Sequence, residues 1–373
     1  MAVRLYDTAK QDVVPFEPGP TVTMYTCGIT PYAASHVGHA AAYVTYDLLQ
    51  RRLRDLGHAT QCVRNVTDVD DDILRKAREL GVHYLDLAAE ETARFDADMS
   101  ALGLITPFSE PRATSAIHDI LGFIGMVLDR GHAYQAAGAV YFSVSTFERF
   151  GQVSHLPREE MLALAAERGG NPDDPAKQDP LDFVLWQPSA PDEPSWPSMW
   201  GPGRPGWHIE CSALALRELG TTIDIHGGGS DLIFPHHECE AAQSEAATGR
   251  PFVRHWVHQG MVRLGGEKMS KSLGNLVFVS DLVKEWDPMA VRLAILANHY
   301  RTAWEWDDVL LPAAVERLER WRAAGEGEAA VDEVRAALDD DLDAPRAVAA
   351  IDEAAKRGKG VSSAATLLGV ALA

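Results

Sequence analysis

The fold is decided by residues 21–66, which read TVTMYTCGITPYAASHVGHAAAYVTYDLLQRRLRDLGHATQCVRNV. The apolar and β-branched runs at 21–27 and 59–66 predict two strands. Between them the spacing predicts a helix over 36–56, with apolar positions at Val44, Leu48, Leu49 and Leu53. Strand, helix and strand in this order predict the βαβ opening of an α/β protein with a doubly wound parallel sheet. Ligands of such a sheet bind beyond the carboxyl ends of its strands, where Cys27, Asn65 and Thr67 fall.

The remaining chain continues the alternation with one interruption. Acidic DVDDD leads into a helix through Leu80, and the pattern from Tyr84 to Gly131 predicts helix. The proline-rich text from Gly151 to Pro205 predicts an irregular insertion between two halves of the sheet. We expect four regions: 1–110, the first half of a Rossmann-like domain; 111–205, an inserted connective region; 206–279, the second half; and 280–373, a helical C-terminal domain.

Composition limits the class of protein. The chain has 373 residues, of which 46% are hydrophobic and 24% charged, as in an ordinary soluble globular protein. Four cysteines are too few for a disulfide framework, and no signal peptide or membrane-spanning run is visible. These features predict a cytoplasmic protein without a membrane partner. A net charge of −20 makes generic nucleic-acid binding unfavourable, because that binding needs Lys and Arg to neutralise phosphates.

Two short motifs have the chemistry to handle phosphates. HVGH, His36 to His39, lies where the first predicted helix begins, and backbone N–H groups and imidazoles there can stabilise an attacked phosphate. Two histidines that only cap and pack the helix explain this motif equally well. KMSKS adds Lys268 and Lys271 on a glycine-bounded loop, where ammonium groups can follow a leaving pyrophosphate. The alternative for KMSKS is a solvated pair of charges on a turn.

Two further loops follow predicted strands. GGGSD, residues 227–231, allows a ligand to approach the backbone closely, as a nucleoside site requires, although a tight turn is at least as good an explanation. NVTD, residues 65–68, places polar groups at the end of the second strand, and the same two readings apply to it.

PHHECE, residues 235–240, concentrates side chains that bind metals. On a helix His236 and Glu240 share one face, whereas His237 and Cys239 point elsewhere. Cys211 lies on the preceding predicted helix and Cys27 ends the first strand, so all could converge at the carboxyl edge of the sheet. Two thiolates, an imidazole and a carboxylate would suit zinc. Two inert buried cysteines beside a histidine-rich helix start remain the alternative.

The motifs in combination carry a resemblance. HVGH and KMSKS resemble the two nucleotide motifs of class I aminoacyl-tRNA synthetases. TCGIT, GWHIECSA, GGGSDLIFPHHE and KMSKSLGN, in this order, resemble the cysteinyl-tRNA synthetase branch of that class. The resemblance implies the class I Rossmann-like fold, ATP with Mg²⁺ as a substrate and one zinc ion held by Cys27, Cys211 and His236, with Glu240 as a further possible ligand. It also implies that Trp207 lines an amino-acid pocket.

Within that branch, KQDPLDFVLWQP, PSWPSMWGPGRPGWHIECSA and DPMAVRLAILANHYR resemble the cysteine ligases of mycothiol biosynthesis. These enzymes join the carboxyl group of L-cysteine to the amine of glucosaminyl-inositol with ATP. The resemblance then implies that His36, His39, Lys268 and Lys271 are catalytic. It implies a cysteinyl-adenylate site formed by Cys27, Gly28, Ile29, Thr30, Asn65, Val66, Thr67, Trp207, Gly229, Ser230, Asp231 and Val262.

Other features bear on the partner. Residues 311–373 hold 12 acidic against 8 basic residues, a poor surface for RNA, so we expect a monomer that acts on small molecules and binds no tRNA. Ala42 stands where both relatives usually have Thr, and Asn171 where the ligases usually have Asp. Three rivals therefore stay open: a cysteinyl-tRNA synthetase, a ligase for another amine, and a non-catalytic sensor of cysteine or nucleotide.

Overall fold

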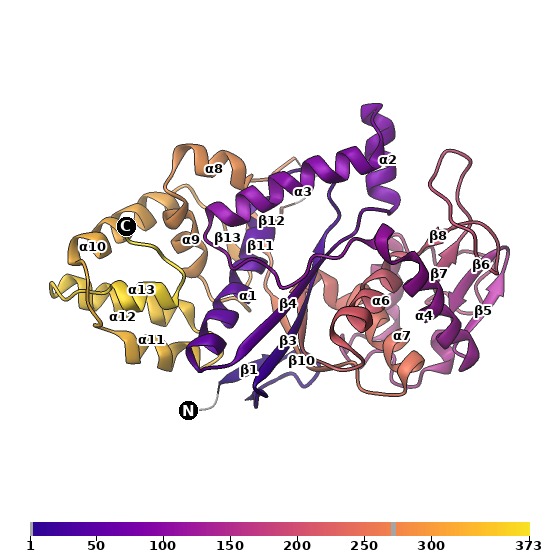
Figure 1. The fold of residues 1–373 in the computed structure, drawn as a ribbon, viewed down its shortest axis with the longest axis horizontal. Coiled ribbons are helices and arrows are strands. Elements are labelled where there is room, and N and C mark those ends of the chain that lie inside the picture. Colours follow the sequence, from indigo (N-terminus) through magenta and orange to yellow (C-terminus); the bar gives the residue numbers. More distant parts are fainter. Residues whose placement is uncertain (1–2, 270–273) are drawn as a thin grey trace.

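A four-stranded parallel sheet forms the centre of the molecule, as the sequence predicts. The computed structural model describes residues 3–269 and 274–373. The strands lie in the order β10–β9–β3–β4, with bounds Val253–Gln259, Ile223–Gly229, Thr21–Ile29 and Ala59–Val66. All three pairings are parallel, so the carboxyl ends of the strands meet at one edge (Figure 1). The α/β class with a parallel sheet is confirmed.

Helices connect these strands and cover the sheet. Helix α1 (Val37–Asp55) joins β3 to β4, α6 (Trp207–Leu219) precedes β9, and α7 (Glu238–Thr248) joins β9 to β10. Strand β3 pairs with both β4 and β9, with Thr26 opposite Gly227. This register places Cys27, one residue further along β3, beside the glycine-rich end of β9.

The stretch from Tyr84 to Gly131, predicted as helical, forms two α-helices separated by a segment that is not α-helical. Helix α2 (Asp71–Leu80) and α3 (Tyr84–Ala101) are followed by an extended segment, and α4 (Ile117–Asp129) begins only after the short η1 (Ala113–Ala116). Gly103 has φ +73° after the end of α3, and Pro107 and Pro111 then remove backbone donors that a helix needs.

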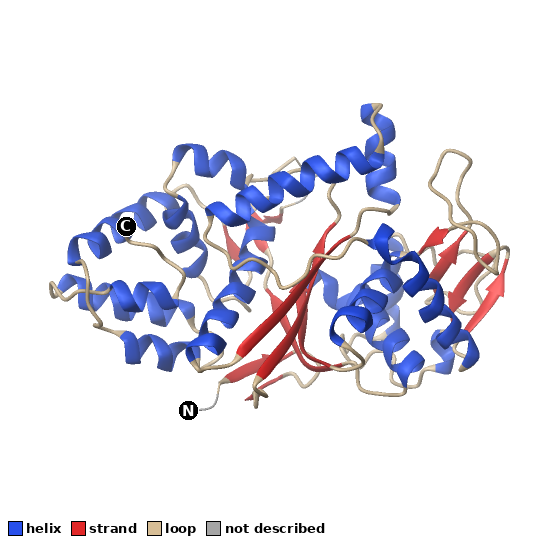
Figure 2. Ribbon diagram, in the orientation of Figure 1, coloured by secondary structure: helices blue, strands red, loops and turns tan. Residues whose placement is uncertain are grey.

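The segment predicted as irregular contains regular structure. Helix α5 (Arg158–Glu167) lies within it, and an antiparallel sheet forms in the order β5–β6–β7–β8. Its strands are Ala133–Ala136, Ala139–Phe142, Phe183–Gln187 and Arg204–Pro205. Pairing of β6 with β7 joins segments distant in sequence, so local pattern could not reveal it. Figure 2 shows this second sheet at the opposite side of the central sheet from the C-terminal helices.

The C-terminal part is mainly helical, as expected. Its helices are α8 (Val279–Glu285), α9 (Pro288–Leu296), α10 (Leu310–Ala324), α11 (Val331–Leu338), α12 (Ala344–Lys356) and α13 (Ser362–Leu367). The exception is β13 (Trp304–Glu305), which pairs in parallel with β11 (Val262–Leu264); β12 (Glu267–Lys268) pairs with the other edge of β11. A hairpin of β1 (Arg4–Asp7) and β2 (Asp12–Pro15) precedes the main sheet.

A buried ion pair connects the first crossover helix with the C-terminal region. The guanidinium of Arg292 on α9 contacts the carboxylate of Asp47 on α1, and both side chains are buried.

The boundaries of the four predicted regions stay predictions. The boundary at residue 110 lies shortly before η1, the boundary at 205 coincides with the end of β8, and the boundary at 279 coincides with the start of α8. Among the described residues, no helix is both long and apolar enough to cross a membrane.

Candidate functional site

A cavity of about 840 Å³ lies beyond the carboxyl ends of β3, β9 and β10. Most of the residues that the sequence singles out line it: Cys27, Gly28, Ile29, Thr30, His36, His39, Trp207, Gly229, Asp231, Val262 and Lys268. They come from both halves of the predicted Rossmann-like domain. The cavity therefore brings together the strand-end motif, which we define as Cys27 to Thr30 at the end of β3, the HVGH motif and the first lysine of KMSKS. A ligand of a parallel sheet is expected at this place.

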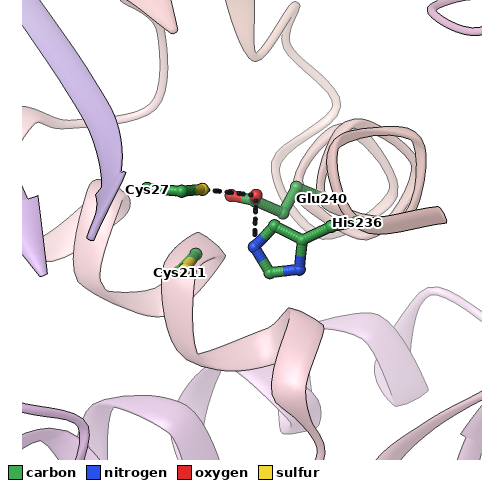
Figure 3. Close-up of side chains that lie close together, drawn as sticks. All are labelled: Cys27, Cys211, His236 and Glu240. Carbon is green, nitrogen blue, oxygen red and sulfur yellow. Dashed lines mark hydrogen bonds and ion pairs between the residues drawn. The ribbon is translucent and has the colours of Figure 1, made fainter. Parts of the chain in front are cut away.

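A cluster of metal-capable side chains lies beside this cavity (Figure 3). One ligand atom from each of Cys27, Cys211, His236 and Glu240 lies within 4.8 Å of all the others, and the four residues are buried. The Nε2 atom of His236 is 3.0 Å from Oε1 of Glu240. The thiol of Cys27 donates to the same oxygen at 3.4 Å. Cys27 also lines the cavity, so the cluster meets the cavity at this residue.

Two histidines near this cluster were not among the predicted site residues. Cys27, His226, His237 and Glu240 also have ligand atoms within 4.8 Å of one another. His226 Nε2 is 3.0 Å from Oε2 of Glu240, and His237 Nε2 is 3.2 Å from Cys27 Sγ. One signal for His226 is its place between isoleucine and glycine in a predicted strand, because a histidine buried in a strand needs a polar partner.

The prediction that His237 points away from the cluster is wrong. It assumed a regular α-helix from Pro235, whereas residues Ile233–His237 form a wider π-type turn and α7 begins only at Glu238. Within that turn Phe234 has φ −135° and ψ 135°, which is not helical. From His237 onward the backbone is helical, with φ −69° and ψ −32° at His237. His236 and His237 precede Glu240 by four and three positions, and both spacings place side chains on one helix face, so both histidines lie beside Glu240. Cys239 belongs to neither group of metal-capable residues, although it lines the cavity.

The charges within the cluster suit a cation. A hydrogen bond from Cys27 lowers the pKa of the Cys211 thiol to about 6, while burial raises the pKa of Cys27. Burial favours a neutral His236, yet the charges of Glu240 and Cys211 raise its pKa to about 10. Although burial favours a protonated acid, His226 and His236 lower the pKa of Glu240. The Cys211 thiolate and the Glu240 carboxylate thus face a protonated His236, and a metal ion could replace that proton.

The donor set fits zinc. Zinc binds thiolate sulfur and imidazole nitrogen with four ligands, and Cys27, Cys211 and His236 supply two sulfurs and one nitrogen from three elements. Glu240 Oε1 lies among these atoms and could be a fourth ligand. A set of two thiolates is unsuited to magnesium or calcium, which prefer oxygen.

His236 has partners on its outer side. Its Nδ1 atom lies 2.9 Å from Nδ1 of His208, and the Trp207 ring stacks on its ring at 4.2 Å. Burial, together with the charge of His236, holds the pKa of His208 well below its ordinary value, so His208 is neutral and can accept the Nδ1 proton. A hydrogen bond of this kind fixes which nitrogen of His236 faces the cluster.

His237 also has an outer partner. Its Nδ1 atom lies 2.7 Å from Nε2 of His258, and the hydroxyl of Thr8 lies 2.6 Å from Nδ1 of the same ring. Burial lowers the pKa of His258 to about 3, so this imidazole is neutral. The chain of contacts holds the His237 ring against Cys27.

The HVGH motif begins α1. His36 is the N-cap residue, and its Nδ1 accepts from the backbone N–H of Gly38 at 3.1 Å. The rings of His36 and His39 stack at 3.9 Å, and both line the cavity. His36 therefore caps the helix and, like His39, also lines the cavity. The capping role does not exclude a role in binding a phosphate.

The segment that follows the KMSKS motif lies against the start of HVGH. The N–H of Val37 donates to the carbonyl of Val277 at 2.9 Å, and Val279 donates to Ser35 at 3.0 Å. The ammonium of Lys268 lies 2.8 Å from the carboxylate of Asp231, which connects the motif with the GGGSD loop. Lys271 lies outside the described residues.

Residues Asn65, Val66 and Thr67 are buried behind the strand-end motif and are not among the lining residues. The Oδ1 atom of Asn65 accepts from the N–H of Gly28 at 2.8 Å, and its Nδ2 donates to Thr67 Oγ1. A Cβ at Gly28 would lie 1.5 Å from the carbonyl oxygen of Asn65, so only glycine fits there. This segment shapes the backbone of the site.

Two other residues that the sequence singled out differ in their place. Ser230 lies between the lining residues Gly229 and Asp231 but does not line the cavity, whereas Ala42 does.

Comparisons with known proteins agree with this arrangement. Residues 14–316 match the family model described as the tRNA synthetases class I (C) catalytic domain. A Streptosporangium roseum protein named L-cysteine:1D-myo-inositol 2-amino-2-deoxy-alpha-D-glucopyranoside ligase is 50% identical over 95% of this chain and 89% of its own length. A Thermomonospora curvata protein of the same name is 52% identical over 96% and 88%.

The fold has matches among solved structures. Mycobacterium tuberculosis methionyl-tRNA synthetase in complex with methionyl-adenylate covers 94% of this chain and 88% of its own, with a TM-score of 0.68 and 16% identity. At that identity the likeness concerns the fold alone, and it supports the class I architecture.

Proposed function

Because the chain belongs to the class I tRNA synthetase family, among relatives named L-cysteine:1D-myo-inositol 2-amino-2-deoxy-alpha-D-glucopyranoside ligase, we propose that it ligates L-cysteine to the amine of glucosaminyl-inositol. ATP provides the energy, and AMP and pyrophosphate are released. The reaction is a step of mycothiol biosynthesis. The observation that carries the proposal is the Cys27, Cys211 and His236 cluster, which borders the cavity that HVGH and Lys268 also line.

Cysteine binds with its side chain toward Cys27 and beside Trp207. A zinc ion held by Cys27, Cys211 and His236, with Glu240 as a possible further ligand, would accept a thiolate far more readily than a hydroxyl. This preference distinguishes cysteine from serine, two near-isosteres that a shaped pocket separates poorly. Trp207 lines the cavity and stacks on His236, with the ring centroids 4.2 Å apart.

The nucleotide occupies the part of the cavity between α1 and Lys268. The cysteine carboxylate attacks the α-phosphorus of ATP with Mg²⁺, the bond to the β-phosphate oxygen breaks, and pyrophosphate leaves. His36 and His39, at the N-terminus of α1, stabilise the charge at the α-phosphate, and Lys268 and Lys271 that of the pyrophosphate. The backbone of Gly28 to Thr30 and of Gly229, with Ser230, Asp231 and Val262, surrounds the adenylate, while Asn65 to Thr67 support it from behind.

In the second step the amine of glucosaminyl-inositol attacks the carbonyl carbon of the cysteinyl-adenylate. The bond to the phosphate oxygen breaks, AMP leaves, and the amine loses a proton to solvent or to the departing phosphate. No covalent intermediate with the protein is needed. The acceptor is a small molecule, so the acidic surface of a chain with net charge −20 does not hinder it. We place the enzyme in the cytoplasm as a monomer that acts without tRNA.

The proposal is tested by measuring AMP release with ATP and cysteine present. Three reactions are compared, with glucosaminyl-inositol, with tRNA and with neither. The proposal expects release that rises with glucosaminyl-inositol and produces the cysteine amide, identified by mass. Stimulation by tRNA alone supports a synthetase instead. Absence of cysteine-dependent pyrophosphate exchange rejects every ligase and leaves the sensor.

A further inference from the structure

The turn that carries His236 is held from outside by a residue of the inserted region. Arg168 lies directly after α5, and its Nη1 donates to the backbone carbonyl oxygens of both Asp231 and Phe234. Helix α5 packs against the π-type turn of residues Ile233–His237. Arg168 is also part of the cavity lining. One guanidinium thus fixes the main chain at two points just before the cluster.

The turn needs such a partner because it is irregular. The 3-10 turn at Ser230–Leu232 passes directly into the π-type turn, with Phe234 in extended backbone conformation. Carbonyl groups in irregular backbone lack the repeating partners of a helix, and a charged donor is the strongest replacement. Asp231 and Phe234 are three residues apart, so the two hydrogen bonds fix the direction in which the chain enters Pro235 and His236.

A second contact runs in the opposite direction across the same interface. Glu238, the first residue of α7, accepts hydrogen bonds from the backbone N–H groups of Gly151 at 2.7 Å, Val153 at 3.0 Å and Ser154 at 2.8 Å. Arg168 of the inserted region therefore binds the main chain before His236, and Glu238 at the start of α7 binds the main chain of the inserted region. This reciprocal arrangement restrains residues 231–238 on both sides of His236.

We propose that Arg168 is a positioning residue that holds Asp231 and His236 in place for the cysteine-activating step. The inference rests on the proposed function. Arg168 binds the main chain of Asp231, whose carboxylate lies 2.8 Å from the ammonium of Lys268. It also binds the main chain of Phe234, two residues before His236. A single side chain of the inserted region thereby sets the place of a metal-capable imidazole and of the partner of the KMSKS lysine.

The test replaces Arg168 with Gln and with Lys and uses Arg158→Gln as the matched control. Arg158 is the first residue of α5, the helix that Arg168 follows; its side chain is 53% exposed and pairs with Asp179 at 2.8 Å on the surface. Each variant is measured for cysteine-dependent pyrophosphate exchange, for the absorption spectrum of the cobalt-substituted protein, and for thermal unfolding. The cobalt spectrum reports the ligand geometry without any need for catalysis.

We expect Arg168→Gln to lower kcat/KM for cysteine by about 10- to 100-fold, the range found when groups that orient metal ligands are removed. The cobalt spectrum should change in the same variant. Arg168→Lys keeps a donor and should recover part of both signals, whereas Arg158→Gln should stay within about twofold of the unsubstituted protein. If Arg168→Gln does not fold, the test rests on Arg168→Lys alone: a changed cobalt spectrum in the folded Arg168→Lys protein then supports the inference.

An unchanged cobalt spectrum in folded Arg168→Gln and Arg168→Lys overturns the inference, whatever happens to activity. So does a loss of exchange that only follows the loss of thermal stability. Absence of cysteine-dependent exchange in the unsubstituted protein overturns the proposed function instead, and the spectra then still decide whether Arg168 positions the cluster.

Discussion

The ammonium of Lys268 lies 2.8 Å from the carboxylate of Asp231, which joins the first lysine of KMSKS to the loop that follows β9. Lys268 is 47% exposed and Asp231 33% exposed, so water screens the pair and it adds little to stability. The arrangement instead keeps the lysine at the rim of the cavity, where a leaving pyrophosphate would pass.

Lys268→Met should therefore separate activity from stability. We expect kcat for pyrophosphate exchange to fall by about 10²- to 10³-fold, the usual loss when one charge-stabilising group is removed, with the free energy of unfolding changed by less than about 1 kcal/mol. Lys284→Met is the control, since Lys284 forms a similar exposed pair with Asp281 at 2.9 Å. Equal kinetics in the two variants would show that Lys268 does not act on the nucleotide.

The two buried thiols Cys211 and Cys62 provide a matched test of the metal site. Cys211 belongs to the cluster, whereas Cys62 lies in a separate apolar core with Val22 and Met24. Cys211→Ser should lower zinc affinity by at least about 100-fold, because a hydroxyl replaces a soft thiolate ligand. Cys62→Ser should retain the metal. Zinc content after dialysis against a graded chelator measures both, and equal retention contradicts the assignment of Cys211 as a ligand.

His208 should affect the metal without being a ligand. Its Nδ1 accepts from Nδ1 of His236 at 2.9 Å, so its removal frees the His236 ring to rotate. We expect His208→Ala to weaken zinc binding by about 10- to 100-fold. His118→Ala, an exposed position on α4, serves as the control. A competitive zinc indicator gives both affinities, and a normal value for His208→Ala means that this contact does not orient His236.

The Arg292–Asp47 pair should control stability and its dependence on pH. Arg292 is fully buried and also donates to the carbonyls of Leu368 and Leu102. Arg292→Met leaves the Asp47 carboxylate with only part of its partners, and loss of one member of a buried pair costs about 3–5 kcal/mol. Denaturant unfolding at neutral pH measures this loss.

The pH dependence has a defined sign. Although burial opposes ionisation, Arg292 and Arg51 lower the pKa of Asp47 below its ordinary value of 3.8. The folded protein therefore holds this proton more weakly than the unfolded chain, and the stabilisation is present above pH 4 and disappears as pH falls further. The difference in unfolding free energy between the native protein and Arg292→Met should shrink below pH 4. A difference that stays constant with pH means that the ionised pair is not its source.

The sequence was sufficient for the parallel sheet and for eleven of the residues that line the cavity. Strand β4 has the predicted bounds, and α1 begins one residue after the predicted start, because alternation and helical spacing are local signals. Residue types alone left the convergence of Cys27, Cys211 and His236 open, and the resemblance to cysteinyl-tRNA synthetases implied it; the structure brings one ligand atom of each within 4.8 Å of the others.

The rest depends on geometry that local pattern does not encode. His237 was misplaced because only the four-residue spacing of His236 and Glu240 was considered, whereas His237 reaches the same helix face from three positions away. His226 was missed because its contact with Glu240 joins β9 to α7, and the way these two elements pack is not a local sequence pattern. Arg168 was missed because its partners are backbone carbonyls more than sixty positions away, and the sequence has no sign for such contacts.

Zinc K-edge X-ray absorption tests the central claim most directly, which is that a metal held by Cys27, Cys211 and His236 recognises the sulfur of the substrate. Spectra are recorded on the zinc-loaded protein alone, with L-cysteine and with L-serine. We expect cysteine to add one sulfur neighbour to the metal and serine to leave the coordination unchanged. A coordination shell that is the same with cysteine as without it, or that changes equally with serine, contradicts the account.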